Sequence, residues 1–327
     1  MGAPAIVCLG AVNVDLLYRV EDLTPFLKEF PPLSRGGEVA ISRAEELALQ
    51  ALVRRHGRFQ MRQGGGQAAN TAWALARMGI HVALVGRVGA DADGAFLTAG
   101  LSGVNLDYLC RAGESGRAYI LVEAGGERTI LVAPNTNDEL GESDIPLETL
   151  ARAGCLHLTS FVGDGPLEVQ EEIARRLRGG PAISLDPGEL YARRGRRVLG
   201  NLLSATETLL VTEAEWDLLG GGRQGRPEWA PPVVVVKRGP RGARLLTPVG
   251  WSDFPAEVQG KIVDTLGAGD VFAAGFLAGR IRELDLAGSV RLAIRAAGLS
   301  LTGAGRERYP DREFLETQVD KLRHPSR

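Results

Sequence analysis

Two kinds of apolar pattern alternate along the chain. Short runs of continuous or alternating apolar residues predict strands at 5–12, 81–86, 155–159, 182–186, 208–211 and 233–237. Apolar residues at helical spacing predict helices at 68–78, 166–178, 269–280, 286–302 and 311–322. Gly79 and the pair Gly179-Gly180 stand where the first two helices would end. This alternation is typical of an α/β protein with a mostly parallel central sheet and helices on both of its faces.

Two segments interrupt the alternation. Residues 117–123 and 128–133 flank Gly125-Gly126 and predict a β-hairpin with a glycine turn. Residues 16–63 form a long excursion after the first strand, in which Ser42 and Glu45 predict a capping box for a helix that reaches about residue 56. We expect insertions at about 16–63 and 112–135 to form a small β lid on a single domain that spans residues 1–327.

Composition and charge exclude several classes of protein. The 327 residues are 44% hydrophobic, and 38 Lys and Arg against 40 Asp and Glu give a formal net charge of −2. Because the near-neutral chain has no long basic run, we expect neither nucleic acid nor a membrane as a partner. The three cysteines form no C-x-x-C pair, and no signal-like start or long apolar span is present, which favours a cytoplasmic location.

Several common catalytic motifs are missing. The one Gly-Lys pair is followed by Ile262, which excludes a P-loop, and Gly267-Ala268-Gly269 has Phe272 where a dinucleotide fingerprint needs glycine. The histidines form no H-E-x-x-H pair, and G-x-S-x-G does not occur. Zinc hydrolases and serine hydrolases are therefore not supported.

The most informative motif is Asp264-Thr265-Leu266-Gly267-Ala268-Gly269-Asp270, directly before a helical run. Small residues at 267–269 let the backbone approach an anion, and the amides at the start of a helix attract it. A carboxylate at Asp270 would repel bound phosphate, unless it takes a proton from a hydroxyl that attacks the phosphate. The alternative is a glycine-rich turn in which Asp270 is simply an early helical residue.

Two further motifs are candidates for binding. Gly64-Gly65-Gly66-Gln67-Ala68-Ala69-Asn70 opens another predicted helix, where a ligand can lie on bare backbone and Asn70 can both donate to and accept from hydroxyls. A flexible turn explains these residues equally well. Asn13 and Asp15 follow the first predicted strand at its carboxyl end, where open α/β sheets bind ligands. An amide and a carboxylate suit vicinal hydroxyls, and a solvated turn is the equal alternative.

In combination, Gly65-Gly66-x-x-x-Asn70 and Asp264-Thr265-x-Gly267-Ala268-Gly269-Asp270 resemble the ribokinase-like, PfkB-type carbohydrate kinase family over nearly the whole chain. Asn13-x-Asp15, Lys237-Arg238-Gly239-x-x-Gly242 and Asp186-Pro187 resemble further elements of that family. The resemblance implies a ribokinase-like three-layer α/β/α sandwich with a mostly parallel central sheet and a small β lid. It also implies ATP, Mg²⁺ and, in many members, a monovalent cation such as K⁺.

The resemblance assigns a role to each matching residue. Asp270 would be the catalytic base, beside an anion hole formed by Gly267, Ala268 and Gly269. The acceptor would be held by Asn13, Asp15, Gly65, Gly66 and Asn70. ATP would be bound at Lys237, Gly239 and Gly242. Asp264 would lie near the monovalent cation, and Glu215 would position Mg²⁺ through water.

The chain departs from the family pattern at two points. The usual N-x-x-E element reads Thr212-Glu213-Ala214-Glu215, which makes the metal assignment the weakest, and Ala90 stands where many members have Asp. The long segment 16–63 and Asp186-Pro187-Gly188 are more similar to the adenosine and nucleoside kinase branch. Neither feature identifies the acceptor. Arg117 and Tyr119 on the hairpin are candidates for acceptor specificity, with a solvated position and lid packing as their respective alternatives.

These observations predict an ATP-dependent kinase that phosphorylates a primary hydroxyl of a sugar or nucleoside. The alternative is a non-catalytic ligand sensor on the same scaffold. Asp270 argues against a sensor, because a protein that only binds needs no base facing phosphate. Uncovered edges of the lid strands favour a homodimer.

Overall fold

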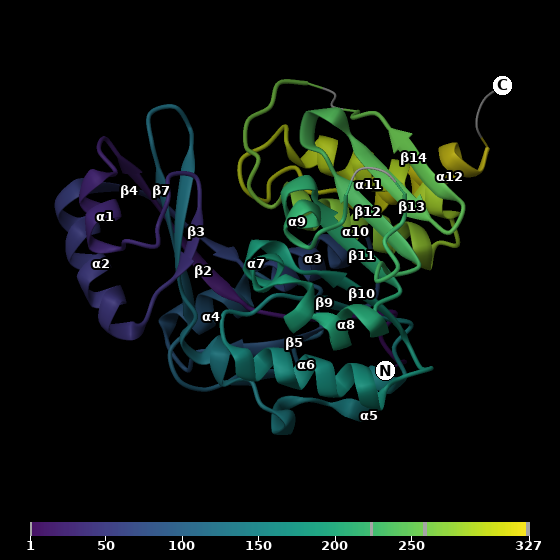
Figure 1. Ribbon diagram of the computed structural model, residues 1–327, viewed down its shortest axis with the longest axis horizontal. Helices are drawn as coiled ribbons and strands as arrows, with labels where there is room; N and C mark the ends of the chain where they lie inside the picture. Colours follow the sequence, from purple (N-terminus) through teal and green to yellow (C-terminus); the bar gives the residue numbers. More distant parts are fainter. Residues whose placement is uncertain (1, 223–224, 258–259, 325–327) are drawn as a thin grey trace.

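The structure is a computed structural model and describes residues 2–222, 225–257 and 260–324. Figure 1 shows two parts, a large body in which helices cover a central sheet and a smaller sheet on the left that carries two helices on its outer side. Within the described residues, no helix has the length and apolar character that crossing a membrane requires.

The central sheet has nine strands in the order β14-β13-β12-β11-β10-β9-β1-β5-β6. Neighbours from β12 to β6 run parallel, whereas β13 and β14 pair antiparallel at one edge. The strands are β1 (Ile6–Leu9), β5 (Val82–Val88), β6 (Leu109–Arg111), β9 (Cys155–Thr159), β10 (Ala182–Asp186), β11 (Thr208–Thr212), β12 (Val233–Lys237), β13 (Ala243–Thr247) and β14 (Gly250–Phe254). The mostly parallel sheet is as predicted, but the antiparallel β13–β14 edge was not foreseen.

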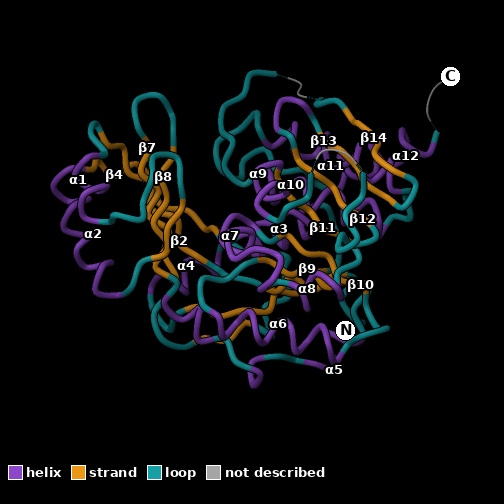
Figure 2. Tube along the Cα trace, viewed as in Figure 1, coloured by secondary structure: helices purple, strands orange, loops and turns teal. Residues whose placement is uncertain are grey.

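Helices cover both faces of this sheet, as Figure 2 shows. On one face lie α3 (Gln67–Arg77), α4 (Ala92–Ala99), α10 (Ala268–Ile281), α11 (Leu286–Ser300) and α12 (Arg312–Arg323). On the other face lie α5 (Leu147–Ala151), α6 (Asp164–Arg176), α7 (Gly188–Val198), α8 (Gly200–Ala205) and α9 (Glu213–Leu218). Alternate residues of β1 serve the two cores, since Ile6 and Cys8 pack on the first and Val7 and Leu9 on the second. The fold is therefore a three-layer α/β/α sandwich.

The smaller sheet has five strands in the order β3-β8-β7-β2-β4. They are β2 (Asn13–Val20), β3 (Glu38–Ala40), β4 (Gly57–Gly65), β7 (Gly116–Val122) and β8 (Arg128–Ala133). Its outer face packs on α1 (Thr24–Glu29) and α2 (Arg43–His56) around Phe26 and Leu49. The predicted hairpin is the β7–β8 pair, and the capping box of Ser42 and Glu45 starts α2 as predicted. We call this sheet with its two helices the lid sheet.

The first predicted strand, 5–12, is shorter in the structure. It ends at Leu9, and Asn13 begins β2 of the lid sheet, so Asn13 and Asp15 lie at the start of a lid strand and not at the end of a central one. Gly10 lies so close to β9 that a Cβ atom there would overlap the Thr159 side chain. Asn137 then donates to the Val12 carbonyl at 3.1 Å and accepts from the Val12 amide at 3.0 Å. These contacts turn the chain from one sheet into the other.

Candidate active site

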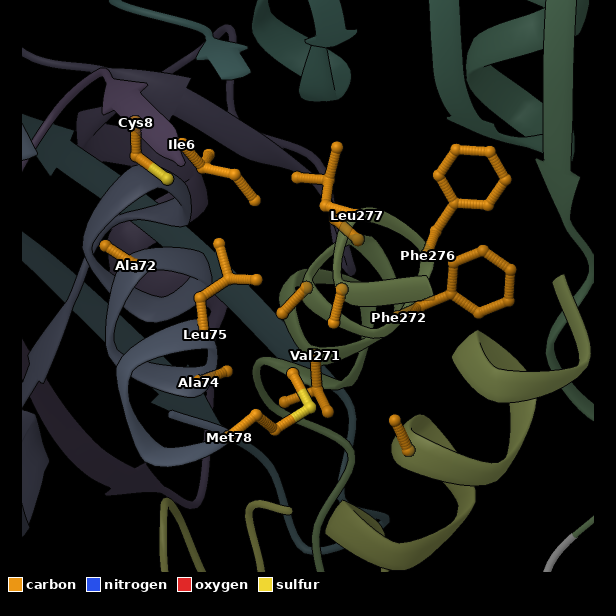
Figure 3. Packing of buried hydrophobic residues seen from close by; sticks show 14 of the residues in the cluster. Ile6, Cys8, Ala72, Ala74, Leu75, Met78, Val271, Phe272, Phe276 and Leu277 are labelled. Carbon is orange, nitrogen blue, oxygen red and sulfur yellow. The ribbon is translucent and has the colours of Figure 1, made fainter. Parts of the chain in front are cut away.

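The two glycine motifs meet because α3 and α10 pack side by side. Figure 3 shows Leu75 of α3 facing Val271 and Leu277 of α10 across the core. At the amino ends of these helices, Asn70 Nδ2 donates to Asp270 Oδ2 at 2.8 Å, across 200 residues of sequence. The packing of two apolar helices therefore brings the two motifs into direct contact.

The start of α10 offers backbone amides to a ligand. Gly267 has a left-handed conformation with φ +74°, and a Cβ atom there would overlap the Tyr309 hydroxyl. Among the described residues, no acceptor is found for the backbone N–H of Gly269 or of Asp270. Free amides at a helix amino terminus attract anions, because the helix dipole adds to their charge.

A cavity of about 300 Å³ lies between the inner face of the lid sheet and the body. Of the residues predicted to hold the acceptor, Asn13, Asp15, Gly66 and Asn70 line this cavity, and Gly267 and Asp270 close one end of it. Gly65 is not among its lining residues. A Cβ atom at Gly65 would overlap the Asp15 carboxylate, so this glycine makes room for that side chain. We call this space the acceptor cavity.

Burial sets the protonation of two carboxyl groups in the acceptor cavity. Burial raises the pKa of Asp270 from 3.8 to about 7, against the hydrogen bond from Asn70, which lowers it. Burial also raises the pKa of Asp15 to about 7, where Arg306 opposes the shift and Asp270 adds to it. A carboxyl group with a pKa near 7 is suited to act as a general base at neutral pH.

Arg306 determines how Asn70 is oriented, although no sequence motif indicates this role. Its guanidinium donates to Asn70 Oδ1 from Nε at 3.2 Å and from Nη2 at 2.7 Å. With its oxygen held in this way, the Asn70 amide directs its nitrogen at Asp270. Asn70 therefore positions the Asp270 carboxylate, in addition to lining the acceptor cavity.

A second cavity of about 530 Å³ lies on the other side of the amino end of α10, and its lining is mostly apolar. It brings together Lys237, Gly239 and Gly242, the three residues predicted to bind ATP, with Ala268 and Gly269. Lys237 Nζ donates to Asp186 Oδ2 at 2.6 Å. Burial opposes the charged form of Lys237, but Asp186 and Glu215 outweigh it, and the pKa of Lys237 is raised.

Thr212 and Glu215 form a capping box at the start of α9. Glu215 Oε2 accepts from the Thr212 amide at 2.7 Å, and Thr212 Oγ1 accepts from the Glu215 amide at 3.3 Å. Glu215 also lines the acceptor cavity. No group of three or more His, Cys, Asp and Glu that could hold a metal ion occurs in the described residues. Magnesium often keeps several waters and takes one or two carboxylates plus substrate phosphates, so Glu215 fits such a role.

Asp264 is occupied by other partners. Its Oδ1 accepts from Arg128 Nη2 at 2.7 Å and from the Leu266 amide at 2.9 Å, and its Oδ2 accepts from the Gly305 amide at 3.0 Å. The Arg128 pair joins the lid sheet to the loop before α10. Because a guanidinium already neutralises this carboxylate, the residues present do not fit a monovalent cation bound by the Asp264 side chain.

Arg117 and Tyr119 point away from the acceptor cavity, so their expected role in specificity is corrected. Asp15 of β2 pairs in register with Ala118 of β7, and it is Ala118 and Ile120 that line the cavity. Arg117 Nε donates to Asp93 Oδ2 at 2.9 Å, and the Tyr119 hydroxyl donates to Glu46 Oε1 at 2.9 Å. Tyr119 belongs to the lid core, which was the alternative for that residue.

Sequence reasoning also missed residues that line the acceptor cavity: Glu38, Gln67, Asn137, Ser160 and Glu189. Gln67 lay within a quoted motif, and its Oε1 accepts from Ser160 Oγ at 3.1 Å. Glu189 directly follows the quoted Asp186-Pro187-Gly188, whereas Glu38, Asn137 and Ser160 come from segments that lie far from the motifs in sequence. Only the pairing of the lid strands and the turn after β9 bring them together.

Fold and site together define an α/β protein in which two cavities meet at a helix amino terminus beside a buried carboxylate. The description "pfkB family carbohydrate kinase" matches residues 37–310. The chain therefore belongs to the pfkB family of carbohydrate kinases, as its motifs predicted. It is a phosphotransferase with an alcohol group as acceptor.

Relatives in other organisms agree with this membership. An uncharacterized sugar kinase of Archaeoglobus fulgidus is 33% identical over 255 residues, which cover 75% of this chain and 99% of that protein. An ATP-dependent ribose-1-phosphate kinase of Halopiger xanaduensis is 33% identical over 92% of each chain.

Solved structures confirm the ribokinase-like fold. Adenosine kinase from Sinorhizobium meliloti has a TM-score of 0.82 at 22% identity, covering 99% of this chain and 100% of that one. Ribokinase from Arabidopsis thaliana, solved with ribose and ATP, has a TM-score of 0.77 at 24% identity, covering 97% and 99%.

Proposed function

We propose that the protein is an ATP-dependent kinase that transfers the γ-phosphate to a hydroxyl of a sugar or nucleoside, with Asp270 as the general base. The observation that carries this proposal is the position of the first turn of α10. Asp270 closes the acceptor cavity, whereas Ala268 and Gly269 line the second cavity. Family membership, and the ribose and ATP held by the similar Arabidopsis ribokinase, support the same arrangement.

In this mechanism the Asp270 carboxylate takes the proton of the acceptor hydroxyl. The hydroxyl oxygen forms a bond to the γ-phosphorus, the bond from that phosphorus to the bridging oxygen breaks, and ADP leaves. The amides of residues 267–270 stabilise the charge on the transferred group. Mg²⁺, when bound, would neutralise charge on the phosphates, and Glu215 would hold it through water. Gly239 and Gly242 shape the pocket for the nucleotide, next to Lys237.

We further propose that residues 1–327 form one domain on which the lid sheet moves. Acceptor binding would draw the inner face of that sheet, including Asp15 of β2, toward the amino end of α10. Closure of this kind excludes water, which would otherwise compete with the acceptor hydroxyl for the γ-phosphate.

The homodimer expected from the uncovered strand edges stays a prediction. Edge strand β4 exposes Phe59 and Met61.

The pH dependence of turnover tests the general base. Because the pKa of Asp270 is about 7 in the fold, the active carboxylate form is lost as the pH falls below that value. We expect kcat/KM to drop by about tenfold per pH unit on the acid side and to level off above about pH 8. Since Asp15 titrates in the same range, the control is Asp15→Asn, which should keep the acid limb. A flat profile in wild type, or loss of the limb in Asp15→Asn, would contradict the assignment to Asp270.

Asp15→Ala tests the placement of the acceptor. Hydrogen bonds from two hydroxyls to a charged carboxylate contribute roughly 1.5 to 3 kcal/mol, so the acceptor KM should rise by about tenfold or more. The KM for ATP should change little, because Asp15 is not among the residues that line the second cavity. Equal changes in both constants would indicate general misfolding. A change for ATP alone would mean that the two cavities are assigned the wrong way round.

A further inference from the structure

A chain of polar contacts links the lid sheet to the acceptor cavity from outside. It begins at Arg128, the first residue of β8, whose Nη2 donates to Asp264 Oδ1 at 2.7 Å. Neither residue lines the acceptor cavity or the second cavity. Within the described residues, the Arg128 guanidinium makes no other hydrogen bond and no other ion pair. Its side chain therefore connects the lid sheet to the body through Asp264.

Asp264 joins two loops of the body. Its Oδ1 also accepts from the Leu266 amide at 2.9 Å, and its Oδ2 accepts from the Gly305 amide at 3.0 Å. Leu266 directly precedes Gly267, where the amides at the start of α10 begin. Gly305 directly precedes Arg306. Burial opposes the charge on Asp264, but the hydrogen bonds from the guanidinium and from these two amides outweigh burial, so the pKa of Asp264 is lowered. The carboxylate is therefore charged at neutral pH and holds both loops.

The second of these loops carries the residue that orients the base. Arg306 Nη2 donates to Asn70 Oδ1 at 2.7 Å, and Asn70 Nδ2 donates to Asp270 Oδ2 at 2.8 Å. Burial raises the pKa of Asp270, and the positive charge of Arg306 counteracts that rise. A shift of this loop would therefore turn the Asn70 amide and move the carboxylate that the amide holds. The contacts from Asp264 thus extend to Asp270 through two hydrogen-bonded side chains.

We propose that Arg128 is a positioning residue for phosphoryl transfer, which acts through Asp264 to fix the amides at the start of α10 and the Asp270 carboxylate. This inference rests on the proposed function and adds a residue to it. Without the guanidinium, a partly buried carboxylate would lack its counter-charge, and the two loops would be held less tightly. Because a displacement of about 1 Å can lower a rate about a hundredfold, looser loops lower turnover more than binding.

Arg128→Gln tests this role by how its effect divides between kcat and KM. The acceptor is whichever of ribose, fructose and adenosine the wild-type protein phosphorylates. We expect kcat to fall by about tenfold to a hundredfold, while the KM values for ATP and for the acceptor each change by less than about threefold. The reason is that Arg128 lines neither cavity. Arg128→Lys keeps a positive charge for Asp264 and should have a kcat at least about threefold above that of Arg128→Gln.

A double variant establishes that the two residues act together. Because the effects of residues that act as a unit do not add, Arg128→Gln combined with Asp264→Asn should lose no more kcat than the more affected single variant. The matched control is Arg35→Gln. Arg35 pairs with Glu123, which directly follows β7 on the same hairpin, so this ion pair lies wholly within the lid segments. The control should keep kcat within about twofold of the wild-type value.

Circular dichroism and melting temperature would establish that each variant folds. Wild-type kcat in Arg128→Gln, an acceptor KM that rises as much as kcat falls, or fully additive losses in the double variant would each overturn this inference and leave the kinase function standing. The same holds if Arg128→Lys is no more active than Arg128→Gln. No turnover by the wild-type protein with any acceptor would overturn the proposed function, and this inference with it.

Discussion

Asp270→Asn is expected to lower kcat by about a hundredfold to ten-thousandfold, while ATP and the acceptor still bind. The substitution preserves the shape of the side chain and its ability to accept from Asn70 Nδ2, which lies 2.8 Å from the carboxylate. It removes only the basicity needed to take the hydroxyl proton. Steady-state kinetics with both substrates varied would measure the loss. Asp107→Asn, at an exposed position outside both cavities, is the matched control and should retain full activity.

The stability of the same variant at different pH values distinguishes a general base from a helix-capping residue. The pKa of Asp270 is raised in the fold, so its contribution to stability is present below about pH 4 and is lost as the pH rises through about 7. Above pH 7 a neutral asparagine should therefore not lower the melting temperature. Wild-type turnover in Asp270→Asn, or a clear loss of stability with normal kinetics, would make Asp270 a structural residue and the mechanism wrong.

Gly267→Val is expected to abolish ATP-dependent turnover. Valine resists the left-handed backbone of this residue, and its side chain would meet the Tyr309 hydroxyl at the point where phosphate approaches the amides. Circular dichroism and melting temperature would establish that the variant folds. Gly179→Val is a matched control, because Gly179 has φ +80° with open space around it, far from the two cavities. The control tests backbone strain without the obstruction. A folded Gly267→Val variant with normal ATP kinetics would place the phosphate elsewhere.

Local apolar patterns predicted most of the helices and strands. They do so because the two buried faces of the sheet require apolar residues at the spacing of each helix or strand. The predicted strands 155–159, 182–186 and 233–237 match β9, β10 and β12, and the predicted end at Gly79 has the expected positive φ of +77°. The break between Leu9 and Asn13 was not visible, because it depends on Thr159 and Asn137, which lie far along the chain. The antiparallel edge β13–β14 was missed because its second strand is short and half polar.

The candidate site, like the fold, could be predicted from the sequence only in part. Glycines and helix starts reveal where an anion can approach, because that property belongs to a short stretch of backbone. Which side chains face that point depends on contacts across the fold. Arg306, whose guanidinium orients Asn70, follows no motif. Arg117 and Tyr119 were candidates for specificity because the sequence alone does not give the register of β7 against β2. Asp264 was assigned to a cation without knowledge that Arg128 of the lid sheet reaches it.

The most direct test of the kinase function follows both products of the reaction. Purified protein, ATP and Mg²⁺ would be incubated with ribose, fructose or adenosine, and ³¹P NMR would record ADP and the phosphate ester of the acceptor together. The proposed mechanism predicts equal amounts of ADP and ester with at least one acceptor, and loss of both in Asp270→Asn. Binding of ATP and an acceptor, seen as a rise in melting temperature, with neither ADP nor ester formed would contradict catalysis and identify the protein as a sensor.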